Sequence, residues 1–197
     1  MSRAGSLVMA LVVVAAACRG GRKARAVDDG GATLDAAAPP VTITPAVLDR
    51  IAAVTVPDHT VAVLARGERD VALAVRKDDL RVLVTVAPCL ACTPIDLAAW
   101  QAQRPALAAL WAPGAEQLPP AAGAALTIAP IAIGAATAMT LDARRGTAGA
   151  AYLAHWNDGV TQAQAVCELA VAPEPTAPSP CAPVAQAALA AVVAALR

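Results

Sequence analysis

The chain has 197 residues, a length that suits one domain with tails. Its 15 basic and 15 acidic residues cancel, and only 2% of its residues are aromatic. A nucleic-acid-binding surface needs a basic track for phosphates or aromatic rings for stacked bases, so we exclude nucleic acid as a partner. Apolar residues make up 58% of the chain, but Ala dominates them. The core must therefore rest on Val, Leu, Ile, Trp and any crosslinks, because burial energy scales with apolar area.

The first seventeen residues have the order of a secretory signal. Arg3 supplies the positive start, residues 7–17 form an apolar run, and small residues close that run. The run is too short for a helix that crosses a bilayer, which needs about 20 residues. We therefore expect residues 1–17 to be a signal peptide and the protein to be exported into an oxidising cell envelope.

The end of this signal, Val14-Ala15-Ala16-Ala17-Cys18, resembles the lipobox of bacterial lipoproteins. In that family the cysteine receives a diacylglycerol and becomes the first residue after cleavage. The resemblance implies a lipid on Cys18 that anchors the protein to a cell membrane, facing the periplasm or the exterior. The position three before the cysteine is usually Leu in that family and is Ala15 here. Ala15-x-Ala17 also suits the ordinary signal peptidase, so secretion without a lipid is the alternative.

Residues 18–43 are expected to form a flexible tether, since they are largely Gly, Ala, Asp and Pro with little periodicity. A basic cluster follows the cysteine directly: Arg19, Arg22, Lys23 and Arg25. Beside an acyl anchor, these side chains would face anionic lipid headgroups. A solvated linker is the other interpretation.

Residues 44–197 are expected to form a single domain. It begins with a short helix, because Thr44 suits the cap and Pro45 the first helical position. Polar turns then separate three predicted strands, at residues 61–65, 71–75 and 81–87. A helix is predicted from Thr93 to about Trp111, and Pro105 is expected to break or kink it.

The second half of this domain is predicted to hold more strands, at residues 126–133, 136–143, 150–156 and 160–169. The last two flank Asn157-Asp158-Gly159, which favours a type I turn followed by a left-handed Gly. A final helix is predicted over residues 184–196. This order predicts an α+β fold: an antiparallel sheet of six to seven strands with helices packed on one face.

Five cysteines are present, and a lipid on Cys18 would leave an even number for disulfides, with three possible pairings. In the structural interpretation, Cys167 and Cys181 join the last strand to the final helix, and Cys89 and Cys92 lock a helix start. A bridge that closes about 15 residues contributes about 3 kcal/mol in the chain-entropy model. Such crosslinks would support an Ala-rich core.

Cys89 and Cys92 also permit a redox interpretation. A strand, C-x-x-C and a helix is how thioredoxin-like oxidoreductases carry their reactive pair, and a helix N-terminus favours the thiolate. This chain has hairpins where those proteins have a βα unit and a cis-Pro strand, so we favour structural bridges. A four-thiolate zinc site would need Cys167 and Cys181 to converge on the same point, and their spacing does not suggest it. We expect no metal and no cofactor.

A Cys-His-Asp group could be drawn from Cys167, His155 and Asp158, but Cys167 is predicted to face the core. The sequence has no hydrolase, metalloprotease or nucleotide-binding motif. We therefore assign no catalytic residues and expect a protein that is not an enzyme. The three tryptophans are expected to be core anchors: Trp100, Trp111 and Trp156.

Residues 88–97 with Trp100, followed by residues 154–160, resemble segments of uncharacterised lipoproteins from high-GC proteobacteria. The order of strands and helices is similar to that of the Mog1/PsbP-like sandwich. The resemblance covers about two thirds of the chain and implies no catalytic residues. The sequence thus favours a membrane-tethered domain that binds or supports an unknown envelope protein. The alternative is a periplasmic thiol-disulfide protein that uses Cys89 and Cys92.

Overall fold

The structure is a computed structural model, and it describes residues 40–112, 126–144, 149–171 and 177–197. The predicted signal peptide (residues 1–17), the lipidation candidate Cys18 and most of the predicted tether lie outside the described residues. Within the described ranges, no helix combines the length and the apolar character that crossing a bilayer requires.

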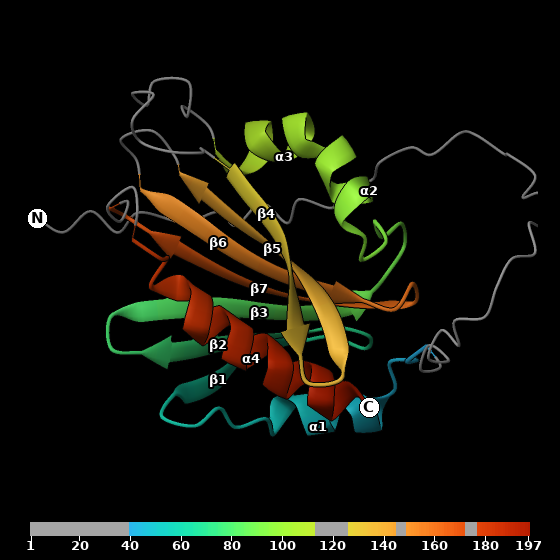
Figure 1. The fold of residues 1–197 in the computed structure, drawn as a ribbon. Helices are drawn as coiled ribbons and strands as arrows, with labels where there is room; N and C mark the ends of the chain where they lie inside the picture. Colours follow the sequence, from blue (N-terminus) through green and yellow to red (C-terminus); the bar gives the residue numbers. More distant parts are fainter. Residues whose placement is uncertain (1–39, 113–125, 145–148, 172–176) are drawn as a thin grey trace, which may run out of the picture. The chain divides into compact units, whose positions relative to one another are not determined.

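The centre of the domain is a seven-stranded sheet in which every neighbouring pair is antiparallel (Figure 1). The strand order is β1-β2-β3-β7-β6-β5-β4. A three-stranded meander, β1 to β3, therefore meets a four-stranded meander, β4 to β7, at the β3–β7 pair. The predicted α+β class and sheet are confirmed. The strands are β1 (Thr60–Arg66), β2 (Val71–Lys77), β3 (Leu80–Pro88), β4 (Leu126–Ile133), β5 (Ala136–Arg144), β6 (Ala150–Asn157) and β7 (Thr161–Leu169).

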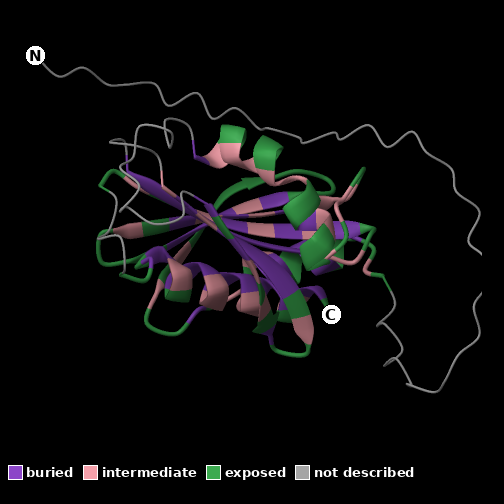
Figure 2. Ribbon diagram, turned by 45° about the horizontal axis from the view of Figure 1, so that its top comes forward, coloured by how far each residue is buried: buried purple, intermediate pink, exposed green. Residues whose placement is uncertain are grey.

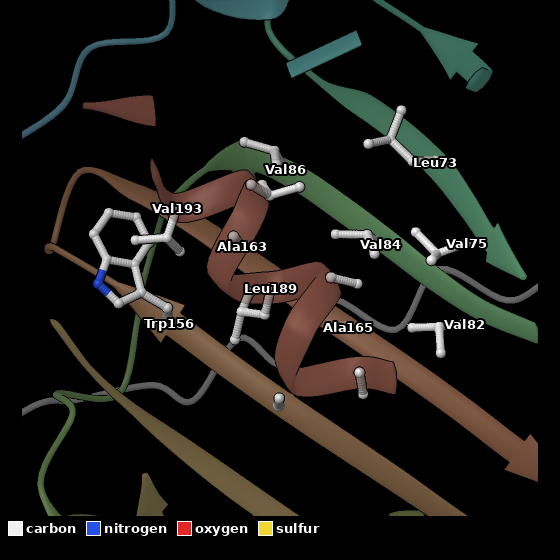
Figure 3. Close-up of a cluster of buried hydrophobic side chains, with 14 of the residues drawn as sticks. Leu73, Val75, Val82, Val84, Val86, Trp156, Ala163, Ala165, Leu189 and Val193 are labelled. Atoms are coloured by element: carbon white, nitrogen blue, oxygen red, sulfur yellow. The ribbon is translucent and has the colours of Figure 1, made fainter. Parts of the chain in front are cut away.

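One face of the sheet is covered by α1 (Pro45–Ala52) and α4 (Cys181–Leu196). Thr44 caps α1 as predicted, since its Oγ1 accepts a hydrogen bond from the Val47 amide at 3.3 Å. Alternate residues of β2 and β3 point toward α4, as the pleat requires. Figure 3 shows Leu189 and Val193 of α4 against these strands. The buried strand residues on this face include Leu73, Val75, Val82, Val84, Val86, Trp156, Ala163 and Ala165.

The opposite face carries α2 (Leu97–Ala102) and α3 (Arg104–Trp111), which pack over β4, β5 and β6. Trp100 forms a second core there with Met139, Leu141 and Leu153. The prediction that helices pack on one face is therefore corrected: helices lie on both faces. The physical reason is that Leu153 alternates with Tyr152 and buries apolar area on the other side of β6, which a helix must cover.

The expected break at Pro105 is present. α2 ends at Ala102, Gln103 intervenes, and α3 starts at Arg104 with Pro105 in its first turn. Proline suits that position because its missing N–H has no helical partner there. The Pro105 break thus divides the predicted helix into α2 and α3. Figure 2 shows that the buried residues are concentrated in the strands beneath these two helices.

Candidate functional site

The structure joins the four cysteines of the domain in two disulfides, the pairing that the structural interpretation favours. Cys167 of β7 is bonded to Cys181 at the start of α4, with 5.8 Å between their Cα atoms. Both are fully buried. Cys89 is bonded to Cys92 across 5.7 Å between Cα atoms, and both are half-buried. Only the second bridge is close to solvent, so it is the centre of the candidate site.

The Cys89–Cys92 bridge lies just beyond the end of β3, where the Cys89 amide donates to the Val160 carbonyl at 2.7 Å. The following helix does not begin at these cysteines. α2 starts at Leu97, and the carboxylate of Asp96 caps it by accepting from the Ala99 amide at 2.8 Å. The expectation that a helix N-terminus lies at the cysteine pair is corrected, because α2 begins only at Leu97, where Asp96 supplies the cap.

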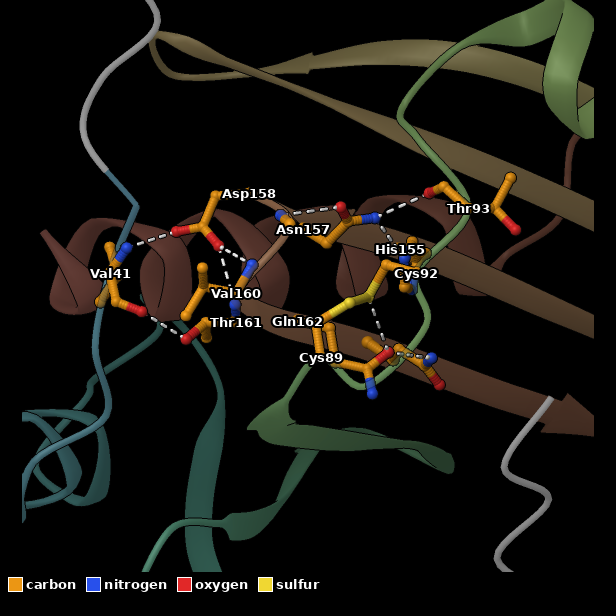
Figure 4. The surroundings of a disulfide bond; sticks show 12 residues. Val41, Cys89, Cys92, Thr93, His155, Asn157, Asp158, Val160, Thr161 and Gln162 are labelled. Carbon is orange, nitrogen blue, oxygen red and sulfur yellow. Dashed lines mark hydrogen bonds between the residues drawn. A yellow bond between two sulfur atoms is a disulfide. The ribbon is translucent and has the colours of Figure 1, made fainter. Parts of the chain in front are cut away.

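A polar cluster of β6 and β7 lies beside the bridge (Figure 4). The Asn157 side-chain amide donates to the Thr93 carbonyl at 3.0 Å and lies 3.0 Å from His155 Nε2. Gln162 Oε1 lies 3.8 Å from Cys92 Sγ and accepts from the Gln164 side chain at 3.3 Å. Asn157 therefore holds the loop after Cys92 against the sheet, and Gln162 lies beside the bridge.

His155 is the most perturbed titratable group of this cluster. It is 5% exposed, and burial lowers its pKa from 6.5 to about 4. The ring of Trp100 lies against it, with centroids 5.5 Å apart. His155 is therefore neutral at physiological pH, and its Nε2 is the natural acceptor for Asn157 Nδ2.

The Cys-His-Asp group does not assemble. Cys167 is buried in the core under α4, whereas His155 contacts Trp100 of α2 on the other face. Cys167 pairs with Tyr152 along the β6–β7 ladder, three residues before His155. The prediction that Cys167 faces the core is confirmed.

Asp158 uses its carboxylate to build the turn between β6 and β7. One oxygen accepts from the amides of Val160 and Thr161, at 2.9 and 2.7 Å. The other accepts from the Val41 amide at 2.6 Å, and the Thr161 hydroxyl donates to the Val41 carbonyl at 2.6 Å. Gly159 has φ +87°, as the predicted turn requires.

These contacts fasten the first described residues to the hairpin. Sequence reasoning missed them and placed residues 40–43 in the tether, although Ile43 is buried in the core. The alternation of Val41 and Ile43 before the Thr44 cap was the available signal.

A second polar cluster lies under α4. The Gln186 side chain donates to the Tyr152 hydroxyl at 2.7 Å, and the Thr140 hydroxyl donates to the Ala129 carbonyl at 2.9 Å. Burial raises the pKa of Tyr152, and burial also raises the pKa of Asp142, which the nearby Arg144 partly offsets. The Tyr152 hydroxyl thus helps to pack α4 against the sheet, whereas the Thr140 hydroxyl joins β5 to the backbone of β4.

Of the expected core anchors, Trp100 and Trp156 are buried, on opposite faces of the sheet, and Trp111 is half-buried against the α2 side. Among the residues that the structure describes, no three His, Cys, Asp or Glu side chains gather as metal ligands.

A scan against models of protein families, a search of curated proteins and a search of solved structures found no match.

Proposed function

We propose that the protein is an exported lipoprotein of the cell envelope, held to a membrane by a lipid on Cys18. The observation that carries this proposal is the use of the cysteines. Four of the five cysteines bond to one another in two disulfides, a state that persists in oxidising compartments. The fifth is Cys18, which stands where the lipobox resemblance requires a cysteine.

The role that the geometry supports best is that of a non-enzymatic domain that binds or supports another envelope protein. The polar side chains around the half-buried bridge already have structural tasks. Asn157 fastens the loop after Cys92, His155 packs under Trp100, and Asp158 closes a turn. A rigid scaffold with two crosslinks suits display of a surface at a membrane.

The second candidate is a thiol-disulfide protein, and one observation favours it: the Cys89–Cys92 bridge is half-buried, within reach of solvent. The acidic cap at Asp96 disfavours the thiol-disulfide role, because a reactive thiolate needs a positive environment. In this candidate, reduced Cys89 would attack a partner's disulfide sulfur, Cys92 would resolve the mixed disulfide, and the partner would leave as a dithiol.

The deciding experiment is mass spectrometry of the protein purified from its own envelope. We expect the mature chain to begin at Cys18 with a diacylglycerol and to hold both disulfides. A Cys18→Ser variant should lose the lipid and appear in the soluble fraction. A mature chain that begins after Ala17 without lipid would contradict the anchor, and one that keeps Met1 with reduced cysteines would contradict export as well.

Insulin reduction in the presence of dithiothreitol separates the two roles. We expect the wild type to match the Cys89→Ser/Cys92→Ser variant, in which the bridge is absent. A rate above that of the variant would favour the thiol-disulfide candidate.

A further inference from the structure

The end of the sheet that carries the Cys89–Cys92 bridge presents apolar side chains to solvent. Leu90, between the two cysteines, is 88% exposed, and Val160 in the neighbouring turn is 43% exposed. Ala91 is exposed as well. The hydrogen bond from the Cys89 amide to the Val160 carbonyl holds the two loops together. We refer to Leu90, Ala91 and Val160 as the apolar tip.

The bridge makes this tip a rigid element. Cys89 and Cys92 are three residues apart, so the disulfide closes a short ring that contains Leu90 and Ala91. A side chain that is already held in place loses less conformational entropy when it binds a surface. Leu90 is the most exposed large apolar residue of the described chain, so it has the largest apolar area to bury against a partner surface.

The chain leading back to Cys18 joins the domain at this same end. Val41 is hydrogen-bonded to Asp158 and Thr161, which lie on either side of Val160 in the sequence (Figure 4). Residues 18–39 lie between the predicted anchor and this point. If these residues form the flexible tether that the sequence predicts, its end-to-end distance would be about 25 Å. A tether of this kind would hold the tip at high effective concentration near the membrane.

The turn between β1 and β2 lies at this same end of the sheet and carries charges of both signs, at Glu68, Arg69 and Asp70. The tip itself has no charged residue, and the carboxylate of Asp158 is turned toward the backbone by the amides of Val41, Val160 and Thr161. The basic cluster that starts at Arg19 lies in the predicted tether and would attract anionic headgroups.

We propose that the apolar tip rests on the membrane that holds the lipid of Cys18, with Leu90 at the boundary between headgroups and acyl chains. This inference rests on the proposed function. It fixes the orientation of the domain: the Cys89–Cys92 end faces the lipid, and the other ends of β3 and β7 face away and are free for a protein partner.

The test places a Trp at either end of the domain in the full mature lipoprotein. Leu90→Trp reports on the tip. Val171→Trp is the matched control, because Val171 is nearly as exposed as Leu90, at 81%. It follows the far end of β7, about 30 Å away along the strand. Each protein is reconstituted in vesicles of phosphatidylethanolamine and phosphatidylglycerol, with or without bromine on the acyl chains. The signal of the wild type, which keeps its three native Trp residues, is subtracted.

With the lipid on Cys18 verified by mass spectrometry, we expect the added fluorescence of Leu90→Trp to shift to the blue and to be lost in brominated vesicles, because a Trp ring settles at the lipid interface. The added fluorescence of Val171→Trp should be unchanged. Equal quenching of the two variants, or none of either, in a lipidated protein would overturn the orientation and leave the proposed function standing. A missing lipid on Cys18 would instead overturn the proposed function.

Discussion

Gly149 occupies a position that only glycine can fill. Its φ is +100°, and a Cβ at this residue would lie 1.9 Å from the carbonyl oxygen of Leu169. Backbone cannot yield as the end of a flexible side chain can. We expect Gly149→Ala to destabilise the protein by at least about 2 kcal/mol, since it adds a left-handed alanine and a backbone clash. The measurement is the urea midpoint at unchanged slope.

Gly134 provides the matched control for this substitution. It also has a positive φ, +62°, but a Cβ there would meet nothing within 4 Å. The cost of Gly134→Ala is then the conformational strain alone, about 1 kcal/mol, which the reduced entropy of the unfolded chain partly offsets. Equal losses in the two variants would contradict the role assigned to the Leu169 contact.

His155 predicts a dependence of stability on pH. Its pKa is about 4 in the folded state and 6.5 in the unfolded state. Between these values the unfolded chain binds more protons, so stability falls as the pH is lowered from 6.5 toward 4. The loss attributable to this residue is about 3 kcal/mol at its full extent.

The His155→Phe variant isolates this effect, because Phe keeps a ring against Trp100 and cannot be protonated. The free energy of unfolding, measured by urea at several pH values, should fall less steeply for the variant than for the wild type below pH 6.5. Parallel curves for the two proteins would show that His155 does not titrate as its burial requires.

At the scale of elements, the two disulfides should differ in their response to reductant. The Cys89–Cys92 bridge is half-buried, whereas Cys167 and Cys181 are fully buried between β7 and α4. A thiolate must reach a sulfur to exchange with it. We expect mild dithiothreitol on the folded protein to open only the Cys89–Cys92 bridge, as seen by alkylation and mass spectrometry. Release of Cys167 at the same rate would contradict this order.

The two bridges should also differ in stability. The Cys167–Cys181 pair is separated by 14 residues and the Cys89–Cys92 pair by 3. The chain-entropy model gives about 3 kcal/mol for the longer loop and about 2 kcal/mol for the shorter. Replacing Cys167 and Cys181 by Ala should lower the urea midpoint more than replacing the half-buried Cys89 and Cys92 by Ser.

Most of the elements could be predicted because their signals are local. β3 is a run of β-branched residues, and the turn at Gly159 follows from the sequence alone. The cap of α2 was misplaced, because Thr93-Pro94 and Asp96 offer competing starts and the structure uses Asp96. The side of the sheet that α2 covers, and the bonds from Val41 to Asp158, depend on contacts between distant residues. The alternation of Val41 and Ile43 indicates an extended segment there, but no local pattern identifies its partners.

At the scale of the whole molecule, the two layers on the sheet are unequal. α4 is a 16-residue helix with a buried stripe that runs its whole length, whereas α3 has eight residues, none of them fully buried. A helix that buries little has few contacts to lose when it opens. The α4 side therefore carries the global stability, and the α3 side should open locally without unfolding the sheet.

Hydrogen exchange of two variants tests this division. Leu189 of α4 is fully buried, so Leu189→Ala should cost about 3 kcal/mol. We expect the amides of β3 and β7 to exchange only through global unfolding, so their protection should fall by about two orders of magnitude. Amides of α3 should keep their lower protection, because their opening does not involve Leu189. Leu107 is a half-buried residue of α3 that packs over the second core. Leu107→Ala should therefore lower the protection of α3 amides more than that of β3 amides. If α3 and β3 respond alike to both substitutions, the domain unfolds as one unit from both faces.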